Sequence, residues 1–150
     1  MTNQKGPSPV KFWGQYESFR KAAEILSKSG RGESIMLLNP IYLLLGFSAE
    51  SLFKSCLPTS TKGHDLFSLY KQYLLQKNAP LNLDGTRALQ YLRKRYHPGT
   101  SNNSVRYPEQ GSKSFMAPSD ILAMLDDLET NIEPLIRQNQ AVFMSVKYGK

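Results

Sequence analysis

Cysteine and histidine are scarce in this chain of 150 residues. Cys56 is the only cysteine, which excludes an intrachain disulfide and any metal site built from several cysteines of one chain. The two histidines, His64 and His97, are too few for a zinc site made from histidine alone. We therefore expect neither a bound metal nor a cofactor.

Long apolar runs are also missing. The uncharged run from Ile35 to Ala49 is interrupted by Asn39-Pro40, and it falls short of the roughly 20 apolar residues that span a bilayer. The first ten residues are polar and hold two prolines, which is unlike the apolar core of a secretory signal. We expect no membrane contact and a cytoplasmic location.

Signals for β-structure are absent as well. No segment alternates apolar and polar residues over the length of a strand, and no Asn-Gly or Asp-Gly turn separates two apolar runs. Apolar residues recur every three or four positions instead, which is the spacing of one helix face. The predicted helices cover about 14–29, 41–57, 64–77, 84–96 and 118 onwards. Asn39 is expected to cap the second helix with Pro40 in its first position, and Pro134 to kink or break the last.

These helices predict an all-α fold, an antiparallel bundle of four to five helices. A chain of this length makes one domain and buries roughly two thirds of its unfolded surface. We expect a flexible N-terminal segment over residues 1–13, the helical bundle over 14–140 and a C-terminal tail over 141–150. The loop over residues 98–117 is long and polar, which is typical of functional or mobile loops.

Charge is distributed unevenly along the chain, whose formal net charge is +7. Residues 71–113 carry eight Lys or Arg against two acidic residues, whereas residues 114–146 carry one Arg against five acidic residues. A basic zone of this kind favours a polyanion such as RNA as partner. The acidic segment of the same chain or of a second copy is the alternative partner.

Three consecutive cations lie at the end of the helix predicted over 84–96, and Tyr91 and Tyr96 lie on either side of them. The candidate nucleic-acid-binding or anion-binding residues there and in the following loop are Arg93, Lys94, Arg95, His97, Arg106 and Tyr107. Cations attract phosphate and aromatic rings stack on bases, which is how many proteins hold single-stranded RNA. The alternative is that cations in a last helical turn only stabilise the helix dipole.

Three short motifs resemble those of HEPN domains. Residues 49–57 contain Glu50 and Lys54 in a Glu-x-x-x-Lys pattern, residues 63–66 read Gly-His-Asp-Leu, and residues 106–108 read Arg-Tyr-Pro. In HEPN partners of minimal nucleotidyltransferases these motifs occur in the same order. From the residues alone, we expect Glu50 and Lys54 to pair across one helical turn, and His64 and Asp65 to be structural residues at a helix start.

The HEPN resemblance implies an all-α domain that dimerises and works in prokaryotic defence, toxin–antitoxin or nucleotide-handling systems. Catalytic members are metal-independent ribonucleases in which four to six residues separate an arginine from a histidine. This chain departs from that pattern, because its nearest pair, Arg93 and His97, is one residue tighter.

We therefore expect a non-catalytic homodimer that binds RNA, a nucleotide or a partner protein. One alternative is an endoribonuclease that uses Arg93 and His97 in an irregular site. The other is an antitoxin or partner subunit of a nucleotidyltransferase.

Overall fold

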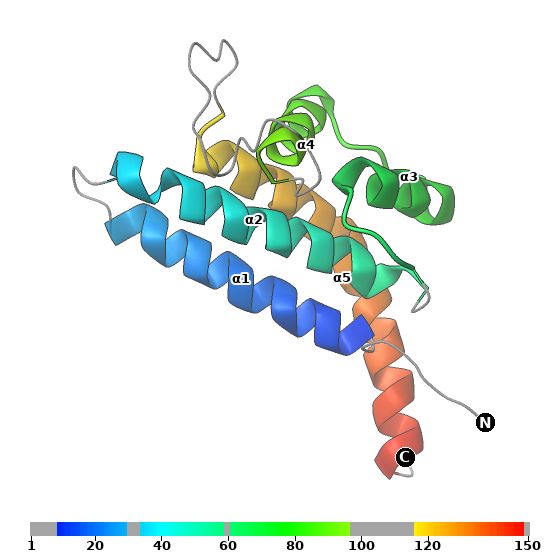
Figure 1. Ribbon diagram of the computed structural model, residues 1–150. Helices are drawn as coiled ribbons and strands as arrows, with labels where there is room; N and C mark the ends of the chain where they lie inside the picture. Colours follow the sequence, from blue (N-terminus) through cyan, green and yellow to red (C-terminus); the bar gives the residue numbers. More distant parts are fainter. Residues whose placement is uncertain (1–8, 30–33, 59–60, 97–115, 149–150) are drawn as a thin grey trace.

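The computed structural model describes residues 9–29, 34–58, 61–96 and 116–148 (Figure 1). Within these ranges the chain forms five α-helices and no strand, so the predicted all-α bundle is confirmed. The helices are α1 (Pro9–Ser29), α2 (Ser34–Cys56), α3 (Leu66–Lys77), α4 (Leu83–Tyr96) and α5 (Pro118–Tyr148). None of them, over the described residues, is long and apolar enough to cross a membrane.

Helix α2 lies at the centre of the bundle. Helix α1 runs antiparallel along it, and α3, α4 and α5 pack on its other sides (Figure 1). Its fully buried side chains include Ile41, Tyr42, Leu45, Ala49, Leu52 and Phe53. A helix that is apolar on nearly every side is stable only when other helices surround it, and α2 meets that condition.

Helices α1 and α5 extend beyond the bundle predicted over residues 14–140. Helix α1 begins at Pro9, so the prediction of a flexible segment over residues 1–13 is wrong for residues 9–13. Proline suits the first helical position, where its missing N–H costs nothing, and Trp13 packs against the core one turn later. Helix α5 continues to Tyr148, so residues 141–148, which were assigned to a tail, extend that helix.

Both internal prolines lie within helices. Helix α2 begins at Ser34, so Pro40 is inside it and Asn39 does not cap it. The Asn39 Oδ1 atom instead accepts a 2.8 Å hydrogen bond from Arg95 Nη2. Helix α5 likewise runs through Pro134 without a break. Both prolines are exposed, and the packing of buried neighbours outweighs the backbone hydrogen bond that each ring removes.

A network of polar side chains joins α1 to α5. The Tyr16 hydroxyl donates a 2.5 Å hydrogen bond to Glu129, and Arg20 forms ion pairs with Asp126 at 2.5 Å and Glu24 at 2.9 Å. Burial and, after it, the Glu129 carboxylate raise the pKa of Tyr16. Two of the acidic residues of α5 therefore face a cation of α1 rather than the cations of α4.

Gly46 of α2 allows the end of α4 to pack closely. A Cβ atom at Gly46 would overlap the ring of Tyr96, the last residue of α4. The buried Tyr96 ring also meets Phe47 edge-on, with 5.4 Å between the ring centroids. The final turn of α4, which carries the three consecutive cations, is thereby fixed against the central helix.

Candidate functional site

The three consecutive cations of α4 lie in three different environments. Successive residues of an α-helix are about 100° apart around its axis, so Arg93, Lys94 and Arg95 point in separate directions. Arg93 pairs with a carboxylate, Lys94 is exposed, and Arg95 is only 7% exposed. The continuous cationic surface that the sequence suggests is therefore not formed by these three residues.

Arg93 contacts the start of α3. Its Nε donates to Asp65 Oδ1 over 2.5 Å, and its guanidinium lies 5.1 Å from the centroid of the Phe67 ring. Asp65 is the N-cap residue of α3 and also accepts a 3.0 Å hydrogen bond from Ser68. The aspartate of the Gly-His-Asp-Leu motif thus compensates the positive charge of Arg93 and connects α3 to α4.

The carboxylate of Glu50 joins three elements. Its Oε1 accepts a 2.5 Å hydrogen bond from Tyr96, and its Oε2 contacts Lys54 Nζ at 2.9 Å and His64 Nδ1 at 2.7 Å. Burial alone would raise the pKa of Glu50, but the hydrogen bonds from Tyr96, Lys54 and His64 together hold it below its usual value. The motif residues therefore connect α2, the α3 start and α4, while the His64 imidazole remains 63% exposed.

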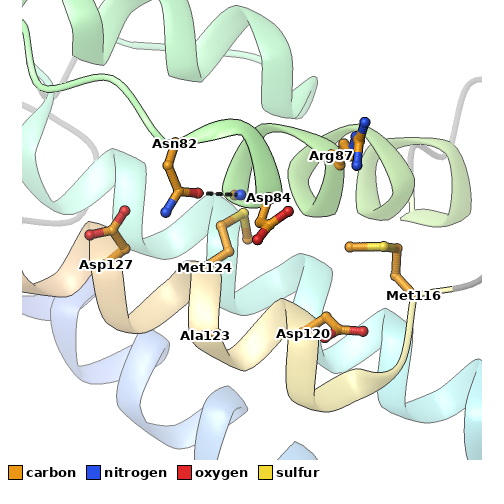
Figure 2. A pocket seen from close by; sticks show the side chains of 9 residues that line it. Asn82, Asp84, Arg87, Met116, Asp120, Ala123, Met124 and Asp127 are labelled. Carbon is orange, nitrogen blue, oxygen red and sulfur yellow. Dashed lines mark hydrogen bonds between the residues drawn. The ribbon is translucent and has the colours of Figure 1, made fainter.

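A groove lies between α4 and the start of α5, and we call it the α4–α5 groove. Its acidic part has a volume of about 420 Å³, and its cationic part about 240 Å³. The acidic part is lined by Asn82, Asp84, Gly85, Arg87, Met116, Asp120, Ala123, Met124 and Asp127 (Figure 2). The cationic part is lined by Arg87, Gln90, Tyr91, Lys94 and Met116. Arg87 and Met116 line both parts, so the two adjoin.

Several polar and acidic residues of the acidic part lie there because α4 and α5 begin at this place. Asn82 accepts a 2.7 Å hydrogen bond from the backbone N–H of Gly85 and so caps α4 (Figure 2). Asp84 and Asp120 lie in the first turns of α4 and α5, where a carboxylate interacts favourably with the helix dipole. Among the described residues no group of His, Cys, Asp and Glu could hold a metal ion.

The cationic part of the groove is one face of α4. Arg87 and Lys94 are seven residues apart, so they lie on the same side of the helix, with Gln90 and Tyr91 between them. Arg87 is exposed and forms no ion pair with any described residue. Arg87 and Gln90 were not among the residues predicted from the sequence. The available signal was that Gln90, Tyr91 and Lys94 follow Arg87 by three, four and seven residues, which places all four on one helix face. The adjacency of Arg93, Lys94 and Arg95 was the more obvious pattern and the less informative one.

Arg95 is buried against the rings of two tyrosines, one of which, Tyr91, lines the cationic part. Its guanidinium carbon is 4.8 Å from the ring centroid of Tyr42 and 5.7 Å from that of Tyr91. The two rings meet edge-on with their centroids 5.6 Å apart. The Tyr42 hydroxyl donates to the backbone oxygen of Met116, and burial and then Tyr91 raise the pKa of Tyr42. Tyr91 therefore lines the groove on one side and contacts a buried cation on the other.

Three predicted site residues, His97, Arg106 and Tyr107, lie outside the described residues. The pairing of Arg93 with His97 is therefore not described, and Arg93 is engaged by Asp65. Comparisons of this chain with models of protein families, with curated proteins and with solved structures find no match.

Proposed function

We propose that this chain is a HEPN-like helical module that binds RNA or a nucleotide in the cationic part of the α4–α5 groove without cleaving it. One observation carries the proposal: Arg87 and Lys94 lie on one face of α4, on either side of Gln90 and Tyr91. Seven residues of helix separate the two cations by roughly 10 Å along the axis. Two cations at that spacing attract phosphates, and the amide and ring between them offer polar and stacking contacts.

The composition of this part of the groove favours binding over cleavage. Phosphodiester cleavage without a metal needs a group that transfers a proton near neutral pH, most often histidine. Arg87, Gln90, Tyr91, Lys94 and Met116 include no such group. The described histidine, His64, is hydrogen-bonded to Glu50 and does not line the groove.

The HEPN resemblance adds the biological side of the proposal. It suggests a homodimer that acts in a prokaryotic defence or toxin–antitoxin system. In support, the Glu-x-x-x-Lys and Gly-His-Asp-Leu motifs contact each other through Glu50 and His64 over 2.7 Å. Motifs that meet in space have a shared structural reason to occur together in the sequence.

The proposal is tested by measuring how tightly the protein binds a fluorescently labelled single-stranded RNA over a series of salt concentrations. Arg87→Ala and Lys94→Ala are each expected to weaken binding and to reduce the slope of log affinity against log salt by about one. Lys71→Ala is the matched control, because it removes an exposed cation of α3 outside the groove. It should leave the affinity and the slope close to those of the wild type.

Three other results would contradict the proposal. If the Arg87→Ala/Lys94→Ala double variant binds RNA as the wild type does, the groove is not the binding site. If RNA does not bind and a nucleotidyltransferase co-purifies, the chain is a partner subunit. If the RNA is cleaved and His97→Ala abolishes cleavage, the chain is an endoribonuclease.

A further inference from the structure

Arg95 is a buried cation whose hydrogen-bonding capacity is only partly used. Its Nη2 donates to Asn39 at 2.8 Å, its Nη1 is 3.4 Å from the Tyr91 hydroxyl, and its Nε is buried with no acceptor. Within the described part of the chain no carboxylate pairs with it. Tyrosine rings compensate a buried guanidinium in part, but a buried charge is strongly favoured to have a counter-charge.

The Nε donor of Arg95, which is buried without an acceptor, lies on the edge of the guanidinium that it shares with Nη2. The Nε–H bond and one N–H bond of Nη2 are parallel in this planar group, and Asn39 occupies only one of the two Nη2 hydrogens. Arginine uses this edge to bind a carboxylate or phosphate with two hydrogen bonds. This edge, whose Nε donor is unused, is therefore suited to an anionic group that the described part of the chain does not supply.

Tyr91 separates this edge from the groove. Its side chain is 9% exposed, it lines the cationic part, and its ring covers the guanidinium of Arg95. A change of side-chain rotamer at a binding site is common when a ligand enters. A rotated Tyr91 would open the guanidinium of Arg95 to a ligand in the cationic part, which Lys94 also lines.

We infer that Arg95 binds the terminal phosphate of the ligand, a phosphomonoester at the end of an RNA strand or on a mononucleotide. This inference rests on the proposed function. A terminal phosphate has one covalent attachment, so it needs less room to reach a buried guanidinium. An internal phosphodiester would have to carry the strand both in and out. A phosphomonoester also has a charge of roughly −1.5 to −2 at neutral pH, which suits a guanidinium and an ammonium group together.

The test compares RNAs of one sequence that differ only at their ends: 5′-hydroxyl, 5′-phosphate and 3′-phosphate. For the wild type, a phosphate at one end should tighten binding by about tenfold or more, the usual effect of added hydrogen bonds between charged groups. Arg95→Lys keeps the charge but lacks the two-donor edge, so it should lose this gain. Arg87→Ala should weaken binding of all three RNAs and retain the gain.

A measurement on the wild type alone tests the inference even if the Arg95→Lys variant does not fold. Adenosine 5′-monophosphate should raise the midpoint of thermal unfolding, whereas adenosine at the same ionic strength should not. If RNA binds but its end chemistry has no effect, the inference is wrong and the proposed function stands. If neither RNA nor adenosine 5′-monophosphate binds, the proposed function is wrong. If a folded Arg95→Lys variant keeps the phosphate-dependent gain, the assignment to Arg95 is wrong.

Discussion

The hydroxyl of Tyr96, at the end of α4, donates a 2.5 Å hydrogen bond to the carboxylate of Glu50 on α2. Burial and, after it, this carboxylate raise the pKa of Tyr96, so the phenol remains the proton donor. Lys54 and His64 contact the other carboxylate oxygen. One half-buried carboxylate therefore positions the helix that carries Arg87, Lys94 and Arg95, and its removal is a sensitive test of the fold.

Glu50→Gln should destabilise the protein by about 1–3 kcal/mol, because hydrogen bonds to a charged group are replaced by weaker ones. The fold lowers the pKa of Glu50 from its usual 4.5. The ionised carboxylate therefore stabilises the protein fully above that value, and this stabilisation is lost as the pH falls through the lower folded pKa. Urea unfolding of the wild type and of Glu50→Gln between pH 6 and pH 3 should show that the difference in their free energies of unfolding becomes smaller as the pH falls.

Glu133→Gln is the control for Glu50→Gln. Glu133 pairs only with the exposed Arg137 among the interactions described, at 2.7 Å, and exposed pairs of this kind contribute little. Its substitution should change stability by a few tenths of a kcal/mol at most. If the difference in free energy of unfolding between the wild type and Glu50→Gln stays constant down to pH 3, the role assigned to the ionised carboxylate is contradicted.

Gly46→Ala should destabilise the protein by about 1–3 kcal/mol, the usual effect of overpacking a buried site. The added methyl group would overlap the Tyr96 ring and push α4 away from α2. Gly14→Ala is the matched control, since a Cβ there meets nothing within 4 Å and Gly14 is inside α1. It should stabilise by about 0.5–1 kcal/mol, because alanine favours a helix over glycine. Thermal unfolding of the two variants should shift in opposite directions, and equal shifts would contradict the packing argument.

Arg93 and Asp65 should show a coupling free energy of at most about 1 kcal/mol in a double-mutant cycle. The pair is short at 2.5 Å, but the side chains are 38% and 25% exposed, so solvent screens it. Arg93→Ala, Asp65→Asn and the double variant complete the cycle, measured by urea unfolding at low and high salt. The coupling should shrink as salt increases. A coupling that does not respond to salt would indicate that packing of Arg93 on Phe67 dominates.

Cys56 should resist alkylation in the folded protein. Burial raises the pKa of its thiol to about 12, and thiolate is the reactive form. At pH 8 iodoacetamide should therefore modify the native protein far more slowly than the protein in urea, as followed by mass spectrometry. Equal rates in the two conditions would contradict the burial of Cys56.

Helix identity could be read from the sequence because it depends on local spacing. The starts of α3 and α4 lie within two residues of the prediction, since Asp65 and Asn82 are polar residues directly before apolar stripes. The starts of α1 and α2 were predicted too late. Pro40 was expected in the first position of the second helix, whereas it is inside α2, with Leu38 before it and Ile41 after it packed on the core.

The candidate site was harder to predict because it depends on which helices become neighbours. Arg93 and Arg95 are equivalent in sequence terms, yet one faces Asp65 at the start of α3 and the other faces Asn39 on α2. Nothing local to α4 distinguishes them. Arg87, which was not among the predicted site residues, lines the groove because α5 begins beside it.

The sequence by itself determined that this protein is a bundle of helices with a basic fourth helix, because apolar periodicity and charge count are properties of a chain before it folds. Only the tertiary structure decided what each cation does. A helix separates consecutive side chains by about 100°, so the packing of α2, α3 and α5 around α4 assigns one arginine to an ion pair, buries another, and leaves Arg87 and Lys94 on the groove.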